Sequence, residues 1–226
     1  MKKLIIAIDG PAGSGKSTIG KMLAERLGYF HLSTGAIYRA LGWKANKDGI
    51  QLTDLPAMTH LIVNTDITFQ PDHAGENKIL VDGQDVTDIL TTNEVGKLAS
   101  AVAVIPEVRQ GLLALQRRAG EQGGVVLDGR DIGTVVFPDA EVKFYLDASP
   151  EERAKRRFLQ LEQQGIASNL EQLIADIKKR DHNDSTRAIA PLRKANDAVY
   201  LDSTALSLEE VVEVMVAEVK KIIALH

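Results

Sequence analysis

Gly10-Pro11-Ala12-Gly13-Ser14-Gly15-Lys16-Ser17 is the stretch that decides the fold, and an apolar run at residues 4–9 leads directly into it. The spacing is that of G-x-x-x-x-G-K-[ST], which binds phosphate where it connects a strand to a helix. The apolar run predicts a buried strand. Apolar residues at helical spacing follow the motif, and Gly28 is placed to end that helix. The context that the motif requires is therefore present.

The residues of the loop indicate that it binds an anion such as a polyphosphate. Its glycines let successive backbone N–H groups point inward at an anion, and the helix N-terminus adds partial positive charge. Lys16 can neutralise β- and γ-phosphate oxygens, and the Ser17 hydroxyl can bind Mg²⁺. A glycine-rich turn without a ligand is the alternative. We expect the polyphosphate-binding residues to be Gly10, Pro11, Ala12, Gly13, Ser14, Gly15, Lys16, Ser17 and Thr18.

The bulk composition excludes several classes of protein. The 226 residues are 44% hydrophobic, which suffices for one sizeable core or a core with an insert. A net charge of −4 gives no basic field for nucleic acid, and the absence of cysteine excludes disulfides and thiolate–zinc sites. The apolar run after Lys2 and Lys3 is too short for a signal peptide, and no run approaches a membrane span. We expect a cytoplasmic protein.

Strand-like runs recur at residues 4–9, 29–32, 125–128, 142–147 and 198–202, with helical patterns between most of them. This alternation predicts an α/β fold, a parallel five-stranded sheet flanked by helices. Three of the runs end in Asp9, Asp128 and Asp147, and open parallel sheets place their sites at the carboxyl ends of strands. A capping box at Ser207 opens a last helix, whose apolar stripe from Leu208 to Ile222 we expect to be core.

Two stretches interrupt this alternation. Within residues 64–87, residues 66–70 alternate with period two, and residues 78–81 and 84–87 flank Asp82-Gly83, a hairpin signal. This pattern predicts a small antiparallel insert. Residues 149–188 begin with the capping box at Ser149 and predict two helices joined at an exposed tip, a helical lid. We expect a core of residues 1–62 and 105–226, an insert of residues 63–104, and the lid arm at 149–188.

Charged residues near the predicted carboxyl edge are candidates for chemistry. Arg153, Arg156 and Arg157 share one helix face. They either form a solvated face, with the i,i+4 pairs Glu151–Lys155 and Glu152–Arg156, or bind phosphate. Asp128 can bind Mg²⁺, directly or through water, while the following Arg130-Asp131 forms either a surface pair or part of a site. Arg180, Asp184 and Arg187 lie at i, i+4 and i+7, and they fit a helical salt-bridge ladder as well as they fit a binding site. Thr34 opens a helix, as a cap or an anion ligand. We interpret none of the five histidines as a metal ligand.

These residues together resemble the bacterial cytidylate kinases, a family of nucleoside-monophosphate kinases. The resemblance is carried by residues 8–18, by Thr34-Gly35-Ala36-Ile37-Tyr38-Arg39 and by the more specific run GRDIGTVVFPDA at residues 129–140. It continues through Arg180-Asp181, Asp184, Arg187, residues 190–192 and residues 201–204, in the order expected along the chain.

The resemblance implies transfer of the γ-phosphate of ATP to CMP or dCMP with Mg²⁺, by a protein whose partners are these small molecules and not nucleic acid or membrane. It also implies that the insert of residues 63–104 binds the nucleoside monophosphate. We expect a monomer. By motif, Arg39, Arg130 and Arg187 resemble ligands of the acceptor phosphate, and Thr34 belongs to the same substrate site. Ser100, Arg109 and Asp131 resemble readers of the cytosine edge, and Arg180 and Asp184 contacts to the sugar. Lys16, Arg130, Arg153, Arg157 and Arg187 are the expected catalytic residues, with Arg153 and Arg157 facing the transferring phosphate from the lid.

One position departs from the family pattern. The family usually has Asp where this chain has Ser33, so a carboxylate role there is absent. Competing interpretations are a kinase for UMP, AMP or a small alcohol, and a nucleotide-binding module without turnover. A GTP-driven switch is disfavoured because Asn46-Lys47-Asp48-Gly49 misses the spacing of a guanine reader, and Asp72-His73-Ala74-Gly75 lies in the predicted insert.

Overall fold

The computed structural model describes residues 3–71 and 77–224, and the chain divides into two compact units. One unit comprises Met1–Leu32 with Gly120–His226, and the other comprises Ser33–Ala119. We call the first the loop unit, because it contains residues 10–17, and the second the middle unit.

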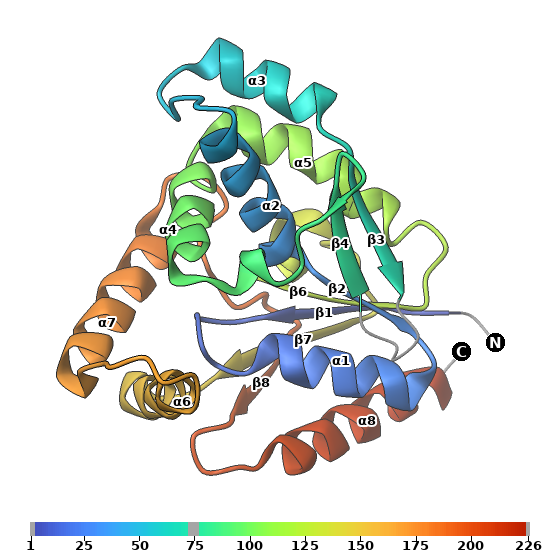
Figure 1. The fold of residues 1–226 in the computed structure, drawn as a ribbon. Helices are drawn as coiled ribbons and strands as arrows, with labels where there is room; N and C mark the ends of the chain where they lie inside the picture. The colour runs from blue at the N-terminus through green and yellow to red at the C-terminus, as the bar shows by residue number, and fades with distance from the viewer. Residues whose placement is uncertain (1–2, 72–76, 225–226) are drawn as a thin grey trace. The chain divides into compact units, whose positions relative to one another are not determined.

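The loop unit is built on a five-stranded sheet with the strand order β2-β6-β1-β7-β8 (Figure 1). The strands are β1 (Ile5–Asp9), β2 (Phe30–Ser33), β6 (Val125–Gly129), β7 (Val142–Asp147) and β8 (Val199–Asp202). β1 pairs in parallel with β6 and β7, and β7 pairs in parallel with β8. β6 is buried at all five positions, as a central parallel strand must be when both faces are covered.

Two helices pack side by side on one face of this sheet, α1 (Lys16–Leu27) and α8 (Leu208–Ala224) (Figure 1). Their apolar faces form one core cluster with β1, β6 and β7, around the fully buried Phe144. α1 ends where Gly28 takes a left-handed conformation, with φ 64°. α8 begins with a complete capping box, because the Ser207 N–H donates to Glu210 and the Glu210 N–H donates to the Ser207 hydroxyl.

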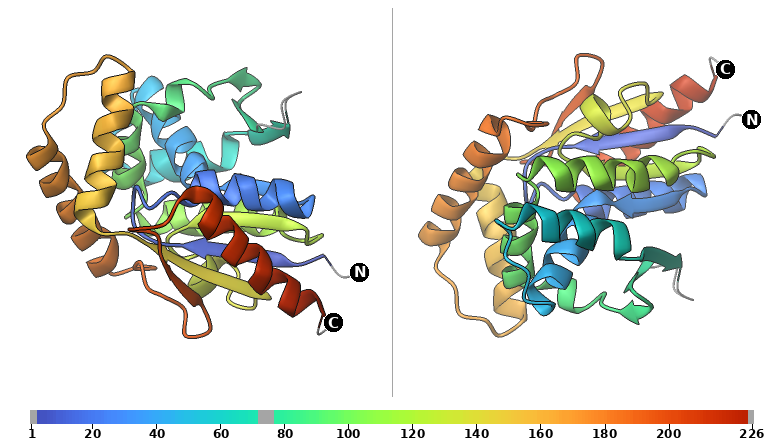
Figure 2. Two further views of the ribbon diagram at one scale, coloured as in Figure 1. Left: turned by 90° about the horizontal axis from the view of Figure 1, so that it is seen from below. Right: turned by 90° about the horizontal axis from the view of Figure 1, so that it is seen from above.

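The arm consists of α6 (Pro150–Gln163) and α7 (Leu170–Thr186), which lie side by side (Figure 2). Ser149 caps α6 by accepting from the Glu152 N–H, and Asn169 caps α7 by accepting from the Gln172 N–H. α6 starts shortly after the carboxyl end of β7. A π-helical turn, η2 (Ile132–Val136), follows the carboxyl end of β6.

The described residues of the middle unit form four α-helices, one short 3₁₀ helix and a three-stranded antiparallel sheet. Its elements are α2 (Thr34–Lys47), α3 (Leu55–Asn64), β3 (Ile67–Pro71), β4 (Asn77–Val81), β5 (Gln84–Asp85), the short helix η1 (Ile89–Thr91), α4 (Asn93–Val102) and α5 (Pro106–Arg118). β4 and β5 form a hairpin whose turn is Asp82-Gly83, with φ 50° and 77°. α2 packs against α4 so closely that a Cβ at Gly42 would approach the Leu98 backbone to 3.0 Å.

The predicted fold class is confirmed: a parallel five-stranded sheet flanked by helices, a small antiparallel sheet and a two-helix arm. The β2 strand lies one residue later than predicted. Leu208 is a correction, since it is 39% exposed although its spacing placed it in the apolar stripe; it is the first residue of α8. Residues 72–76 of the predicted insert lie outside the described residues. The boundaries at 62 and 105 and the role of the arm as a lid stay predictions.

Within the described part of the chain, no single helix has the length and apolar character needed to cross a membrane. Residues 94–102 of α4 and α5 meet that criterion only together, as a pair bent by 100°.

Candidate active site

The phosphate loop connects β1 to α1 and adopts the curled backbone that its glycines permit. Gly10, at φ 152°, passes so close to β7 that a Cβ there would lie 2.0 Å from the Leu146 carbonyl oxygen. Gly15 caps α1 at φ 92°. The Ser14 N–H donates to the Pro11 carbonyl over 3.4 Å, which closes the loop on itself. The helix N-terminus is thus presented at the carboxyl edge of the sheet, as an anion site requires.

Lys16 folds back over this loop. Its ammonium donates to the Pro11 carbonyl at 2.5 Å and to the Ser14 hydroxyl at 3.2 Å, and the residue is 5% exposed. Burial lowers the pKa of this ammonium well below its usual value. A phosphate oxygen is a stronger partner for a buried ammonium than a carbonyl is, so the loop holds its cation ready for an anion.

Ser17 and Asp128 join the loop to the end of β6. The Ser17 hydroxyl donates to Oδ2 of Asp128 over 3.1 Å, and Oδ1 of Asp128 lies 2.8 Å from Nε2 of His31 on β2. Burial raises the pKa of Asp128, but the hydrogen bond and charge of His31, with Lys16 and Ser17, bring it below its usual value. The carboxylate is therefore ionised at neutral pH.

This pair fits a magnesium ion. A hydroxyl and a carboxylate are hard oxygen donors, and Mg²⁺ is commonly bound by one or two protein oxygens with phosphates and water completing its shell. Among the described residues, no three His, Asp or Glu side chains cluster as a metal site built wholly from protein would need. Ser17 is exposed, so its hydroxyl can be reached.

Asp9, at the end of β1, fixes the segment that follows β6. Its two carboxylate oxygens accept from the N–H groups of Ile132 and Gly133, each over 2.8 Å, at the start of η2. Burial raises the pKa of Asp9 to about 7, and the two backbone N–H groups oppose that shift. These bonds position the preceding residues, Arg130 and Asp131.

Arg130 and Asp131 pair with charged residues at the end of the arm. Nε of Arg130 donates to Asp184 on α7 over 2.9 Å, and the guanidinium of Arg187 lies 3.6 Å from Asp131. Arg187 also donates to the Ala190 carbonyl. Arg180 lies one turn before Asp184, and burial of Asp184 is outweighed by Arg130 and Arg180, which lower its pKa. The structure therefore brings together five of the predicted substrate residues.

The three arginines of α6 differ in their surroundings. Arg153 is 2% exposed, and its guanidinium donates to the Ala12 and Ala148 carbonyls and to both oxygens of Asp181 on α7. Arg156 donates to Glu152, as its i,i+4 spacing predicted, and to the Ser203 carbonyl. Arg157 is half-buried and donates to Gln160. Arg153 thus links the arm to the phosphate loop; that it faces a transferring phosphate stays a prediction.

The remaining predicted substrate residues belong to the middle unit. Thr34 is the buried first residue of α2, and Arg39 is half-buried one turn later. Arg109 on α5 is 8% exposed, lies 5.5 Å over the ring of Tyr38 and donates to the Ala103 carbonyl. The Ser100 hydroxyl donates to the Gly96 carbonyl within α4.

The model of the cytidylate kinase family matches residues 6–221 of this chain. The chain belongs to the cytidylate kinase family. It is 50% identical over 222 residues to the cytidylate kinase of Geobacter sp. (strain M21), covering 98% of this chain and 94% of that protein. Over 213 residues it is 51% identical to the cytidylate kinase of Caldicellulosiruptor bescii, covering 94% of each. A solved structure of an uncharacterized protein from Eubacterium ventriosum shares the fold alone, with a TM-score of 0.51 at 13% identity over 97% of this chain and 99% of that one.

Sequence reasoning missed two residues that contact the candidate site. His31 contacts Asp128, and Asp181 holds Arg153. The position of His31 on the strand before the Thr34 helix was the available signal, since that strand and β6 end at the same edge. Asp181 stood within the quoted motif, but no spacing in the sequence relates it to Arg153 on another helix.

Proposed function

We propose that this chain transfers the γ-phosphoryl group of ATP to CMP or dCMP, giving CDP or dCDP. The observation that carries the proposal is the curled loop with Lys16 buried inside it, next to the Ser17–Asp128 pair. Membership of the cytidylate kinase family supports the acceptor.

Positioned positive charge is the chemistry that the transfer needs, because its transition state spreads negative charge over the transferring oxygens. Backbone N–H groups of the loop and Lys16 would bind the β- and γ-phosphates, and Ser17 and Asp128 would hold Mg²⁺. Mg²⁺ supplies charge to the phosphate oxygens when bound. The acceptor is already an anionic phosphate, so no residue need remove a proton.

We assign the acceptor residues by motif. Thr34, Arg39, Ser100 and Arg109 from the middle unit, and Arg130, Asp131, Arg180, Asp184 and Arg187 from the loop unit, would bind the acceptor nucleotide. Arg109 and Asp131 offer a donor and an acceptor to the cytosine edge, which itself presents both. Arg130, Arg153, Arg157 and Arg187 would stabilise the transferring group. A cytoplasmic, monomeric protein without nucleic-acid or membrane partners also stays a prediction.

The substrate is tested by release of ADP from Mg-ATP with CMP, dCMP, UMP, AMP or shikimate as acceptor. We expect CMP or dCMP to give the highest kcat/KM. A higher value with AMP or UMP would reject the acceptor, and a higher value with shikimate would reject the reaction class.

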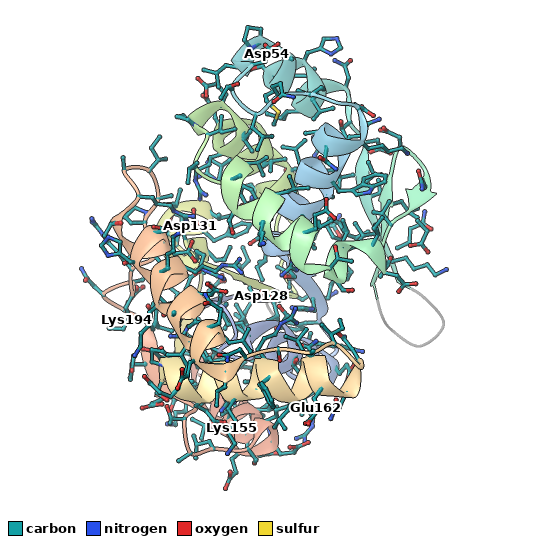
Figure 3. The ribbon with its side chains drawn as sticks, turned by 60° about the vertical axis from the view of Figure 1, so that its left-hand side comes forward. Asp54, Asp128, Asp131, Lys155, Glu162 and Lys194 are labelled. Carbon is teal, nitrogen blue, oxygen red and sulfur yellow. The ribbon has the colours of Figure 1, made fainter. Side chains whose placement is uncertain are left out.

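The loop is tested by Lys16→Ala, which removes the buried ammonium. We expect kcat to fall by about 10²- to 10³-fold, the usual cost of losing one preorganised charge donor. Lys155→Ala, an exposed lysine on α6 that points outward in Figure 3, is the matched control and should leave kcat unchanged. A near-normal kcat for Lys16→Ala contradicts the role given to this residue.

Base reading is tested by Asp131→Ala. We expect the KM for CMP to rise about tenfold or more while the KM for ATP changes less than threefold, since a buried acceptor for the base is lost. Asp139→Ala removes an exposed aspartate from the same run and serves as the control. Equal changes in the two KM values would count against base reading by Asp131.

A further inference from the structure

The two oxygens of the Asp128 carboxylate have different neighbours. Oδ2 faces the Ser17 hydroxyl at 3.1 Å, and Oδ1 faces Nε2 of His31 at 2.8 Å (Asp128 is labelled in Figure 3). A carboxylate only accepts hydrogen bonds, so Nε2 of His31 donates in this contact. The carboxylate can turn about its Cβ–Cγ bond, and a donor on Oδ1 restrains that rotation.

The His31 ring occupies the space that Gly20, which has no side chain, leaves on α1. A Cβ at Gly20 would lie 2.8 Å from Nε2 and 2.9 Å from Cδ2 of His31, so any larger residue at position 20 would displace the ring. The His31 side chain is 14% exposed and that of Asp128 is 5% exposed. Gly20, His31 and Asp128 therefore form a chain of contacts that runs from α1 to the end of β6.

We propose that His31 is a positioning residue for the magnesium ion: it fixes the Asp128 carboxylate so that Oδ2 stays directed at the Ser17 hydroxyl. The inference rests on the proposed function for one point, the assignment of Mg²⁺ to Ser17 and Asp128. Hydrogen-bond partners that orient a metal-binding carboxylate typically change metal affinity by about 10- to 100-fold when removed.

A merely structural His31–Asp128 pair predicts a different result. It would contribute to stability and would affect nucleotide binding equally with and without metal. If His31 is a positioning residue, its removal weakens metal binding and leaves metal-free nucleotide binding unchanged, because the phosphate loop itself is untouched.

Four single variants of the full chain, together with Gly20→Ala in the His31→Ala background, separate these possibilities. His31→Leu removes the donor but keeps an apolar side chain of similar bulk, and His31→Gln keeps an N–H donor. Gly20→Ala keeps histidine at position 31 but displaces its ring. His31→Ala is the background in which the same change at Gly20 meets no ring.

The readout is Mn²⁺ binding to the enzyme–ADP complex, which is measured as the loss of the free Mn²⁺ signal in electron paramagnetic resonance. ADP binding in EDTA is measured by calorimetry. We expect His31→Leu and Gly20→Ala to weaken Mn²⁺ binding at least tenfold, and His31→Gln less than threefold. ADP affinity in EDTA should stay within twofold of the parent. In the His31→Ala background, Gly20→Ala should cause no further loss.

Mn²⁺ affinity within twofold of the parent in His31→Leu overturns the inference. So does an equal loss of ADP affinity in EDTA, or a Gly20→Ala effect that is the same with and without the ring. If His31→Leu does not fold, the comparison of Gly20→Ala in the two backgrounds decides. A parent protein that binds Mn²⁺ with ADP but transfers no phosphate to CMP rejects the proposed function and leaves this inference standing.

Discussion

Two helices of the loop unit have the same length and opposite means of attachment. α7 and α8 each span 17 residues. α8 buries Val211, Val212, Met215 and Val219 in the core, whereas α7 has no buried residue. α7 is instead held by two buried ion pairs of its own, in which Asp181 contacts Arg153 and Asp184 contacts Arg130. Arg187, which directly follows the helix, contacts Asp131.

This difference predicts which helix can respond to a ligand. Apolar burial stabilises α8 by about 1.5–3 kcal/mol per large side chain and is indifferent to phosphate. The partners of α7 are Arg153 and Arg130, cations for which a phosphate competes with Asp181 and Asp184. We therefore expect α8 to be a fixed support of the sheet, and we expect the anchoring of α7 to change when a phosphate binds to Arg130 or Arg153.

The largest expected effect on stability is that of a substitution in the apolar face of α8. Met215 is 0% exposed, so Met215→Ala should lower the free energy of unfolding by about 3 kcal/mol through lost burial and the cavity left behind. Urea denaturation measures it. Val214→Ala, one residue earlier and 41% exposed, is the control and should change stability by less than about 0.5 kcal/mol. Similar losses in both variants would show that α8 is not held through this stripe.

The attachment of α8 could be predicted from the sequence because it depends on spacing alone. Val211, Met215 and Val219 recur at a helical period, and the capping box at Ser207 marks the start. The phosphate loop was predictable for the same reason, since its residues are consecutive. Leu208 shows the limit: periodicity gives the face of a residue but not whether the sheet extends far enough to cover it.

A smaller effect is expected where the arm is tied to the loop. Asp181→Asn removes the charge that pairs with the buried Arg153 guanidinium and should cost about 2 kcal/mol. Since α7 buries no residue, we expect the loss as local opening, with amides of α7 exchanging about thirtyfold faster in hydrogen-exchange mass spectrometry.

Glu151→Gln is the matched control for the Asp181 variant. Glu151 pairs with Lys178 and so also joins α6 to α7, but both side chains are more than half exposed, at 57% and 56%. Screened surface pairs contribute about 0–1 kcal/mol, so exchange in α7 should change little. If the two variants speed exchange equally, the buried pair is not what anchors the arm.

The partners of α7 were not predictable from the sequence, for a physical reason. Ion pairs carry no periodicity across elements, so Asp184 and Arg187 fitted a ladder along one helix as well as contacts to Arg130 and Asp131. His31 was overlooked similarly, because one histidine on a strand carries no spacing signal. Residue type and approximate location were predictable; which charge meets which was set by the folded backbone.

The smallest expected effect concerns the pH dependence of the second ion pair. Burial of Asp184 opposes ionisation, but Arg130 lowers the pKa of this carboxyl below its usual 3.8. A carboxyl whose pKa is lower in the folded state stabilises the protein above about pH 4, and that contribution disappears as the pH falls through the folded value. Asp184→Asn should therefore cost about 1 kcal/mol at pH 7, and the difference from the parent should shrink below pH 4.

Urea denaturation at pH 7, 5, 4 and 3.3 measures this difference directly. Glu162→Gln, at an exposed position of the arm labelled in Figure 3, is the control for a carboxylate near the same helices and should give a difference close to zero throughout. A gap between Asp184→Asn and the parent that stays constant from pH 7 to pH 3.3 means that the ionised pair with Arg130 adds nothing. Of the two buried ion pairs made by residues of α7 itself, only that of Asp181 would then anchor the helix, and the contrast with α8 would narrow to one buried ion pair against one apolar stripe.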